Sequence, residues 1–345
     1  MDRIQQTFAQ VGGPATPAVD GPSSDITPMP RHKPSHAAER APDAQTAPVS
    51  SALFVSVIVP VYNDVEGLKK CLGALEDQTF PAGAYEVIVV DNGSTPPIAP
   101  LLSPYHHAVP QFEALPGSYA ARNRGVAASR GEILAFTDAD CTPAPSWIAE
   151  GVAALGANPD CGLIAGDIRV VPRNPASPTI VEFYELAYGF RQAFYVTEGF
   201  GATANLFTRR DVFDAVGPFD ARLRSCGDRE WGMRVSDAGY RLCYAEAPLV
   251  LHPARRTWGE LITKTARVSG GMFELARLQG NGRGHSMAVA LSELRPPLRQ
   301  ALRVLQGEGP PGWWPKLSVI AALILRRWVT AFEWLRLEAG ASPRR

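Results

Sequence analysis

The sequence has no uninterrupted apolar run of about 18 residues, the length that spans a bilayer, so no transmembrane helix is expected. Its first residues, MDRIQQTFAQVGG, lack the apolar stretch of a signal peptide, which disfavours export by that route. Cysteine is scarce, with five residues and no CxxC pair. This count predicts neither a disulfide framework nor a cysteine zinc site, and a reducing compartment, the cytoplasm, is expected.

Net charge is also lacking, since the formal value is zero at pH 7, but the charges are unevenly distributed. Residues 1–50 carry −1, residues 51–254 carry −8 and residues 255–345 carry +9. A basic tail can attract nucleic acid or anionic lipid. Because tryptophans within an apolar run suit lipid better, no nucleic-acid partner is expected.

Composition divides the chain into three regions. Residues 1–50 are rich in Pro, Ala and Ser and poor in clustered large apolar side chains, so this lead is predicted to be disordered. Residues 51–254 contain the apolar runs of a large globular domain, and residues 255–345 form a basic extension with helical patterning.

The apolar runs predict an α/β domain. Residues 54–61 (FVSVIVPV), 87–91 and 133–137 are short β-branched runs that indicate buried strands. Val65, Leu68, Leu72 and Leu75 recur at helical spacing between the first two. Strand, helix and strand in this order favour a mainly parallel sheet flanked by helices, with further strands near 162–171 and 203–208.

Polar residues that follow the strands should meet at one sheet edge. Asp138 and Asp140 follow the third run, and alternate residues of an extended segment point the same way, so both carboxylates can face one divalent cation. The alternative is a solvated turn. Two close carboxylates at the end of a buried strand repel unless a cation or proton intervenes, and this favours the metal site.

Other polar groups have both a functional and a structural interpretation. Asp91 can accept from a nucleoside and Gly93 permits a close turn, although Asp-Asn-Gly is also strong turn chemistry. Arg122 and Asn123 can reach phosphates or lie on a solvated helix face. His252 is either a third metal ligand or a buried, satisfied histidine.

Residues 226–231 (CGDREW) predict a helix start with acids at its positive end. Asp228 there is either a helix cap or a general base for an acceptor hydroxyl, with Trp231 as an apolar wall. The segment 199–205 (GFGATAN) has small residues that would let a substrate approach closely, although packing would explain the same residues.

Five motifs in order resemble the family 2 nucleotide-sugar glycosyltransferases of the GT-A fold, a Rossmann-like fold. They are Pro60-x-Tyr62-Asn63, Val89 to Thr95 (VVDNGST), Ala121 to Gly125 (ARNRG), Phe136 to Asp140 (FTDAD) and Gly227 to Trp231 (GDREW). Each motif is weak alone, but their order and spacing make the resemblance specific over about residues 54–260.

The resemblance implies a donor site, a cation and a base. Asp91 and the Pro60–Asn63 turn would hold the nucleoside of a nucleotide-diphosphate sugar. Asp138 and Asp140 would form a DxD motif that binds ribose and a Mg²⁺ or Mn²⁺ ion. Asp228 would be the base, and attack opposite the departing diphosphate would invert the anomeric configuration.

The expected site residues fall into four groups. They are the catalytic Asp228; the donor-binding Pro60, Tyr62, Asn63, Asp91, Gly93, Arg122, Asn123 and Asp138; the metal ligands Asp138, Asp140 and His252; and the acceptor-side Asn205, Glu230 and Trp231.

Two departures qualify the resemblance. Gly227 stands where many relatives carry Glu, so the base role depends on Asp228 alone and a non-catalytic donor-binding scaffold is one alternative. Ile324 replaces Gln in the QxxRW motif of processive synthases, so transfer of one or a few sugars is expected. A sugar-phosphate nucleotidyltransferase is disfavoured because PVYNDVEG, not a Gly- and Arg-rich loop, follows the first strand, and the same position lacks the GxGxxG of a nicotinamide-dependent dehydrogenase.

Residues 313–337 contain four tryptophans and the apolar run 317–325, followed by Arg326 and Arg327. This pattern favours a helix in the membrane interface, with the basic extension attracted to anionic lipid. Peripheral attachment to the inner face of the cell membrane, where lipid-linked acceptors are found, is therefore expected beside saccharide acceptors. The alternative is a helix packed on the catalytic domain.

Overall fold

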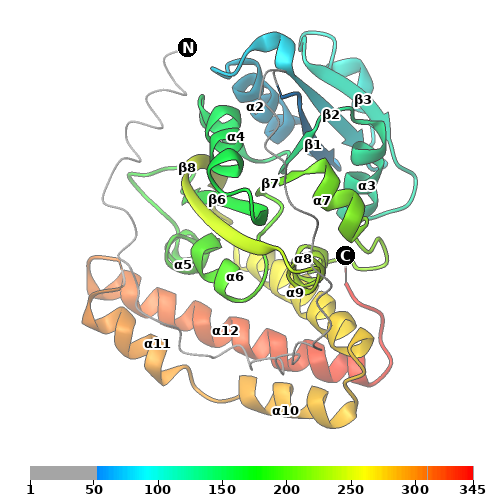
Figure 1. Cartoon of the computed structure of the whole chain (residues 1–345). Coiled ribbons are helices and arrows are strands. Elements are labelled where there is room, and N and C mark those ends of the chain that lie inside the picture. Colours follow the sequence, from blue (N-terminus) through cyan, green and yellow to red (C-terminus); the bar gives the residue numbers. More distant parts are fainter. Residues whose placement is uncertain (1–52, 309, 345) are drawn as a thin grey trace.

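The computed structural model describes residues 53–308 and 310–344 (Figure 1). The prediction of a disordered lead over residues 1–50 lies outside the described residues. Within them, one sheet has the strand order β3-β2-β1-β4-β7-β6-β8-β5. Its strands are β1 (Val55–Val61), β2 (Tyr85–Asp91), β3 (Ala108–Phe112), β4 (Ile133–Thr137), β5 (Thr142–Pro143), β6 (Cys161–Val171), β7 (Asn205–Arg209) and β8 (Arg241–Pro253).

The sheet is mixed and mostly parallel, which confirms the predicted fold class. Strands β1 to β4 pair in parallel, and β6 pairs in parallel with β8. Strand β7 is antiparallel to both β4 and β6, and β5 is antiparallel to β8. The carboxyl ends of β1, β2 and β4 therefore meet at one edge, as the sequence predicted.

Helices cover both faces of the sheet. Apolar residues of α2 (Val65–Glu76) and α4 (Trp147–Ala157) pack in one buried cluster, and those of α3 (Ser118–Ala128), α7 (Arg210–Val216) and α8 (Gly227–Asp237) pack in another. Strand residues alternate between the two, since Val57 and Val59 enter the first cluster and Ile58 the second. The elements α5 (Ile180–Tyr188) and α6 (Gln192–Thr197) lead into β7, and η1 (Ala82–Ala84) and η2 (Ala99–Leu101) are short 3₁₀ turns.

A disulfide corrects the expectation from the cysteine count. Cys161 on β6 and Cys243 on β8 are bonded, with their Cα atoms 6.1 Å apart. The two cysteines are separated by 82 residues, and only the pairing of β6 with β8 makes them neighbours. Strand order is a tertiary property, so the spacing of the cysteines could not reveal this bond.

The basic extension is helical, as predicted. It comprises α9 (Trp258–Leu278), α10 (Arg283–Glu293), α11 (Leu298–Arg303), the π-helical turn η3 (Val304–Glu308) and α12 (Trp313–Glu338). These helices lie below the sheet in Figure 1, with α12 running beneath α5. Val319 and Leu323 of α12 are buried with Val181, Tyr184 and Leu261, so α12 packs on the catalytic domain along part of its circumference. Among the described residues, no helix is both long and apolar enough to cross a membrane.

Candidate functional site

The loops after β1 and β2 are fastened to each other. The backbone N–H of Asn63 donates to Ser94 Oγ at 2.9 Å, and Asn63 Oδ1 accepts from the Thr95 N–H at 2.8 Å. Asn63 has a φ of 52°, the left-handed conformation that Asn tolerates better than most residues. The first two donor-side segments predicted from sequence therefore lie together, beside Pro60 and the exposed Tyr62.

Asp91 holds the loop after β2 through its carboxylate. It is buried at the end of β2, and its two carboxylate oxygens accept from the N–H groups of Ser94 at 2.8 Å and Ile98 at 3.0 Å. Gly93 supplies the turn with a φ of 88°, which favours glycine. The structural interpretation of Asp-Asn-Gly as turn chemistry is thus confirmed, while its contact with a nucleoside stays a prediction.

A series of side-chain contacts joins Asp138 to Asp228. Asp138 follows β4 and forms an ion pair with the buried Arg122 of α3. The Arg122 guanidinium lies 5.5 Å from the ring centre of Tyr119, whose hydroxyl donates to Asp228 Oδ1 at 3.2 Å. The buried Arg122 Nε has no hydrogen-bond partner among the described residues, so part of this cation's donor capacity is left for another group.

Asp228 is the second residue of α8, which begins at Gly227 after Cys226 in the left-handed conformation. Its Oδ1 also accepts from the backbone N–H of Arg229 at 2.9 Å. Burial raises the pKa of the Asp228 carboxyl, and the nearby Arg122 guanidinium partly opposes that shift. A carboxylate with a raised pKa and an orienting phenol is suited to general-base chemistry.

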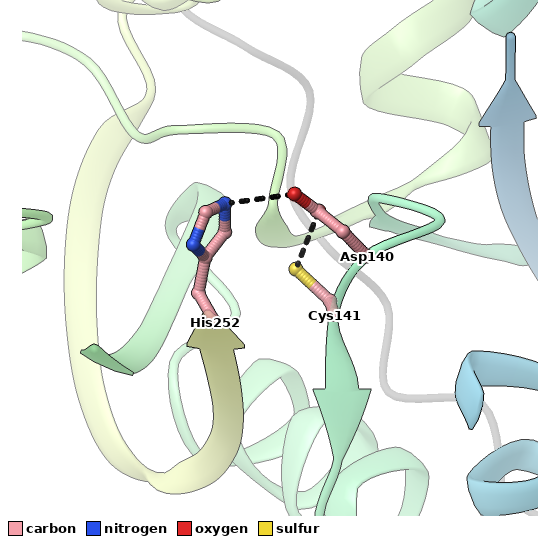
Figure 2. Close-up of side chains that lie close together, drawn as sticks. All are labelled: Asp140, Cys141 and His252. Carbon is pink, nitrogen blue, oxygen red and sulfur yellow. Dashed lines mark hydrogen bonds and ion pairs between the residues drawn. The ribbon is translucent and has the colours of Figure 1, made fainter. Parts of the chain in front are cut away.

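Asp140, Cys141 and His252 form a second cluster (Figure 2). Asp140 Oδ2 lies 3.4 Å from His252 Nε2, and the ligand atoms of Asp140, Cys141 and His252 are all within 4.8 Å of one another. His252 Nδ1 lies 2.9 Å from the Pro253 carbonyl oxygen, a contact that requires a proton on Nδ1. The Nε2 atom faces Asp140, so His252 can offer this nitrogen to a cation there, as metal-binding histidines do.

The donor set fits a divalent cation in part. A carboxylate and an imidazole are suitable ligands for Mn²⁺, and the carboxylate suits Mg²⁺. Burial raises the pKa of Asp140, with His252 opposing the shift and Asp138 adding to it. Burial also raises the pKa of the Cys141 thiol well above its usual value, which makes it the weakest ligand of the three. Of the predicted metal set, the structure brings Asp140 and His252 together, while Asp138 pairs with Arg122.

Asn123 and Asn205, both predicted to contact substrate, form hydrogen bonds with other residues of the protein. The Asn123 side-chain amide donates to the Phe219 carbonyl at 2.8 Å and accepts from the Phe219 N–H at 3.0 Å. Asn205 is fully buried. It accepts from Trp147 Nε1 and donates to the carbonyls of Asp167 and Pro248. The structure thus gives Asn205 a core role, with no polar atom left for an acceptor.

The other acceptor-side predictions also have internal partners. Trp231 is fully buried among aromatic rings of α7 and its neighbouring loop, and its Nε1 donates to the Gly217 carbonyl at 2.9 Å. Glu230 forms an ion pair with Arg234, one turn further along α8, at 2.7 Å. Trp231 therefore anchors α8 in the core, which fixes Asp228, and does not form a substrate wall.

Sequence reasoning missed a buried charge cluster next to His252. Glu185 accepts from Arg255 at 2.9 Å and from Lys264 at 3.0 Å. The Phe190 ring contacts both Lys264 and His252, with 5.5 Å and 4.7 Å to its centre. Burial lowers the pKa of Lys264 to about 8. The available sequence signal was the pair Arg255-Arg256, two residues after the end of β8, because the carboxyl end of a strand is where ligands bind.

Tyr119 and Cys141 were also missed, for another reason. Each lies within two residues of a predicted motif in sequence, but only the tertiary structure turns the Tyr119 hydroxyl toward Asp228 and the Cys141 thiol toward Asp140.

Comparison with known proteins places this geometry in a family. Residues 56–218 match the model of Glycosyl transferase family 2. The chain is 39% identical over 248 residues to Glycosyltransferase AglE of Haloferax volcanii, covering 70% of this chain and 80% of that protein. It is 30% identical over 232 residues to the Pre-mycofactocin glycosyltransferase of Mycobacterium tuberculosis, covering 64% of this chain and 47% of that relative.

A solved structure shares the fold. The mannosyltransferase PcManGT from Pyrobaculum calidifontis, in complex with GDP-Man and Mn²⁺, aligns with a TM-score of 0.52 at 20% identity, over 85% of this chain and 77% of that one. The matched family model, the identity to AglE over most of both chains and the GT-A architecture together show that this chain is a glycosyltransferase and belongs to glycosyl transferase family 2.

Proposed function

We propose that the enzyme transfers a sugar from a nucleotide-diphosphate donor to an acceptor hydroxyl, with inversion, and that it is not processive. The observation that carries the proposal is the chain from Asp138 through Arg122 and Tyr119 to Asp228. It connects the motif expected to bind the donor to a carboxylate suited to act as a base. A scaffold that only binds a donor has no need of a buried carboxylate oriented by a phenol.

The donor is expected to lie over the loops after β1 and β2. The hydrogen bonds between Asn63 and residues 94–95 hold this surface rigid before the nucleoside arrives. Tyr62 is 63% exposed and offers its ring to a base or ribose. Arg122, with its unpartnered Nε, supplies positive charge for the diphosphate.

A divalent cation, Mn²⁺ or Mg²⁺, is proposed at Asp140 and His252, with Asp138 toward the ribose as the DxD motif implies. The solved structural relative that contains GDP-Man with Mn²⁺ supports this choice. When bound, the cation would neutralise the charge that develops on the departing diphosphate. His252 is held for this task by the Pro253 carbonyl, and Asp140 by its contact with His252.

The chemical step then falls to Asp228. Its carboxylate takes the proton of the acceptor hydroxyl, the acceptor oxygen forms a bond to the anomeric carbon, and the bond from that carbon to the diphosphate oxygen breaks. Attack from the face opposite the leaving group inverts the configuration. The Tyr119 hydroxyl keeps Oδ1 of Asp228 in place, so that Oδ2 is left to accept the proton.

The experiment compares wild type with Asp228→Asn, the double variant Asp138→Ala/Asp140→Ala, and Asp237→Asn, an exposed carboxyl in the same helix as Asp228. Thermal shift with nucleotide diphosphates and nucleotide sugars, with and without Mn²⁺, measures donor binding. Donor hydrolysis or transfer measures chemistry. We expect the Asp228→Asn variant to bind the donor without hydrolysing or transferring it. The double variant should lose the stabilisation that depends on Mn²⁺, and Asp237→Asn should behave as wild type. Turnover that survives Asp228→Asn would contradict the proposed base.

A further inference from the structure

Helix α12 buries one side and exposes a row of large apolar side chains on another. The row is made of two groups about three turns apart, residues 313–317 and 328–335, and this spacing keeps both groups on one face of the helix. Its members are between 40% and 65% exposed. They are Trp313, Trp314, Leu317, Trp328, Phe332 and Leu335.

The preceding helices expose a second row. It also has helical spacing, along α10 and then along α11 and η3, and its members are between 45% and 68% exposed. They are Met287, Leu291, Leu294, Leu298, Leu302 and Leu305. A soluble monomer rarely exposes so many large apolar side chains from consecutive elements.

The two rows face the same way. His285, near the start of α10, contacts Trp334, and Arg327 donates to the carbonyls of Ser292 and Arg295 at the end of α10, so α10 and α12 run antiparallel. Viewed down each helix axis from its N-terminus, the exposed row lies about a quarter turn away from the side that contacts the other helix. The direction of this turn is the same for both helices. In an antiparallel pair, equal rotations lead to the same side. We call this shared surface the α10–α12 face; the helices that form it lie at the end of the molecule below the sheet in Figure 1.

The charges around the α10–α12 face are positive. Residues 283–344 contain nine Lys and Arg and four Glu. The three of those Glu whose side chains are described, Glu293, Glu333 and Glu338, are buried or nearly so and form ion pairs with arginines. Arg295 and Arg299, next in sequence to Leu294 and Leu298 of the second row, are exposed. The exposed charge that surrounds the apolar rows is therefore cationic.

We propose that the α10–α12 face lies flat on an anionic lipid bilayer, with both apolar rows in the interface. Tryptophans and leucines bordered by cations are the composition of an in-plane membrane surface. A second copy of the chain fits less well, because a symmetric contact would bring like charges together. The inference does not rest on the proposed chemistry; it names the partner of a surface that the proposed function leaves unused.

The test uses the full chain, without donor or acceptor, and vesicles of phosphatidylcholine alone or of equal parts phosphatidylcholine and phosphatidylglycerol. Sedimentation measures the bound fraction, and tryptophan emission reports whether indoles leave water. Two double variants probe the rows separately, Trp328→Gln/Phe332→Gln on α12 and Leu291→Gln/Leu298→Gln on α10 and α11. Phe112→Gln is the control, since Phe112 is 59% exposed on the distant edge strand β3.

We expect binding to the anionic vesicles only, weakened by salt, with a blue shift in emission. Each double variant should bind more than tenfold more weakly, and Phe112→Gln should bind as wild type. Because all substituted residues are exposed, circular dichroism should show every variant folded. No wild-type binding would overturn the inference. So would an effect of the α12 pair alone, which would indicate a single interfacial helix, or a dimer that the variants dissociate, which would make a second copy the occupant.

Discussion

The two ends of the candidate site use polar side chains differently. In the loops after β1 and β2, Asp91, Asn63 and Asn92 accept from or donate to backbone groups, and each satisfies a fixed partner. At the other end, Asp138, Asp140 and Asp228 contact side chains of Arg122, His252 and Tyr119, and the pKa values of Asp140 and Asp228 are raised.

This difference indicates that one group of residues holds the loops in place and that the other can take part in the reaction. A carboxylate that accepts backbone N–H bonds holds a loop in one conformation and has little capacity left for a substrate. A carboxylate buried against titratable side chains can exchange protons or bind a cation. We therefore expect substitutions at the first end to affect mainly stability, and substitutions at the second end to affect mainly turnover.

The largest effect is expected from Asp228→Asn, which removes the base and keeps the shape. Turnover should fall by about 10²- to 10⁴-fold, the usual contribution of a general base, while donor affinity stays near that of wild type. Single-turnover transfer rates and donor titration separate the two quantities. A loss of donor affinity with unchanged turnover would move Asp228 into the binding surface.

The pH dependence of the wild type should show the same group. A base works only when deprotonated, so activity is lost as the pH falls through its pKa. Burial raises the pKa of Asp228 above the ordinary carboxyl value of 3.8, and the acidic limb of kcat/KM should lie correspondingly higher. Tyr119→Phe removes a hydrogen bond that favours the charged form, so it should move this limb further up. A limb that does not move would assign it to another group.

The cation ligands come next. Asp140→Asn and His252→Gln should each weaken the affinity for Mn²⁺ at least tenfold, because each removes a charge or a lone pair from the cluster. Cys141→Ala should change it little, since the raised thiol pKa leaves Cys141 protonated. Manganese titration followed by thermal shift ranks the three variants. A dominant effect of Cys141→Ala would reverse the assignment of ligands.

The sequence predicted the fold, and it predicted which acids lie together at the sheet edge, because both depend on where the parallel strands end. Short β-branched runs and the acids that follow them placed Asp91, Asp138 and Asp140 at one edge. His252 was placed near them because it, too, ends a strand. These predictions need only the periodicity of the chain and the rule that parallel strands end together.

The remaining features depend on contacts between distant segments. Asn205 and Trp231 were predicted to lie on the acceptor side, but their partners lie in α4, β6 and the loop after α7, and this burial left no local pattern. The disulfide of Cys161 and the apolar rows of the α10–α12 face were hidden for the same reason. Tryptophans and arginines around the apolar run 317–325 predicted an interfacial helix, but the antiparallel pairing of α12 with α10 is a tertiary fact.

Asp91→Asn tests the loop end of the comparison. Asparagine keeps one acceptor oxygen and replaces the other by an NH₂ group, which would face the N–H of Ser94 or Ile98. Leaving one buried donor without a partner should lower the free energy of unfolding by about 1–3 kcal/mol. Urea denaturation measures this change. Unaltered stability with a lost donor affinity would instead show that Asp91 faces the nucleoside.

The smallest effect is expected from Asn123→Ala, which decides between two roles for a residue in the ARNRG motif. The Asn123 amide bridges α3 to the backbone of Phe219, so its loss should lower stability by about 1–2 kcal/mol through two partly exposed hydrogen bonds. Donor affinity should change by less than about twofold, because a coupling of a few tenths of a kcal/mol is all that a remote packing change transmits here. Arg124→Ala, at an exposed position of the same helix, is the matched control for helix propensity. A tenfold loss of donor affinity at unchanged stability would place Asn123 with the catalytic end of the site and would make its bridge to Phe219 incidental.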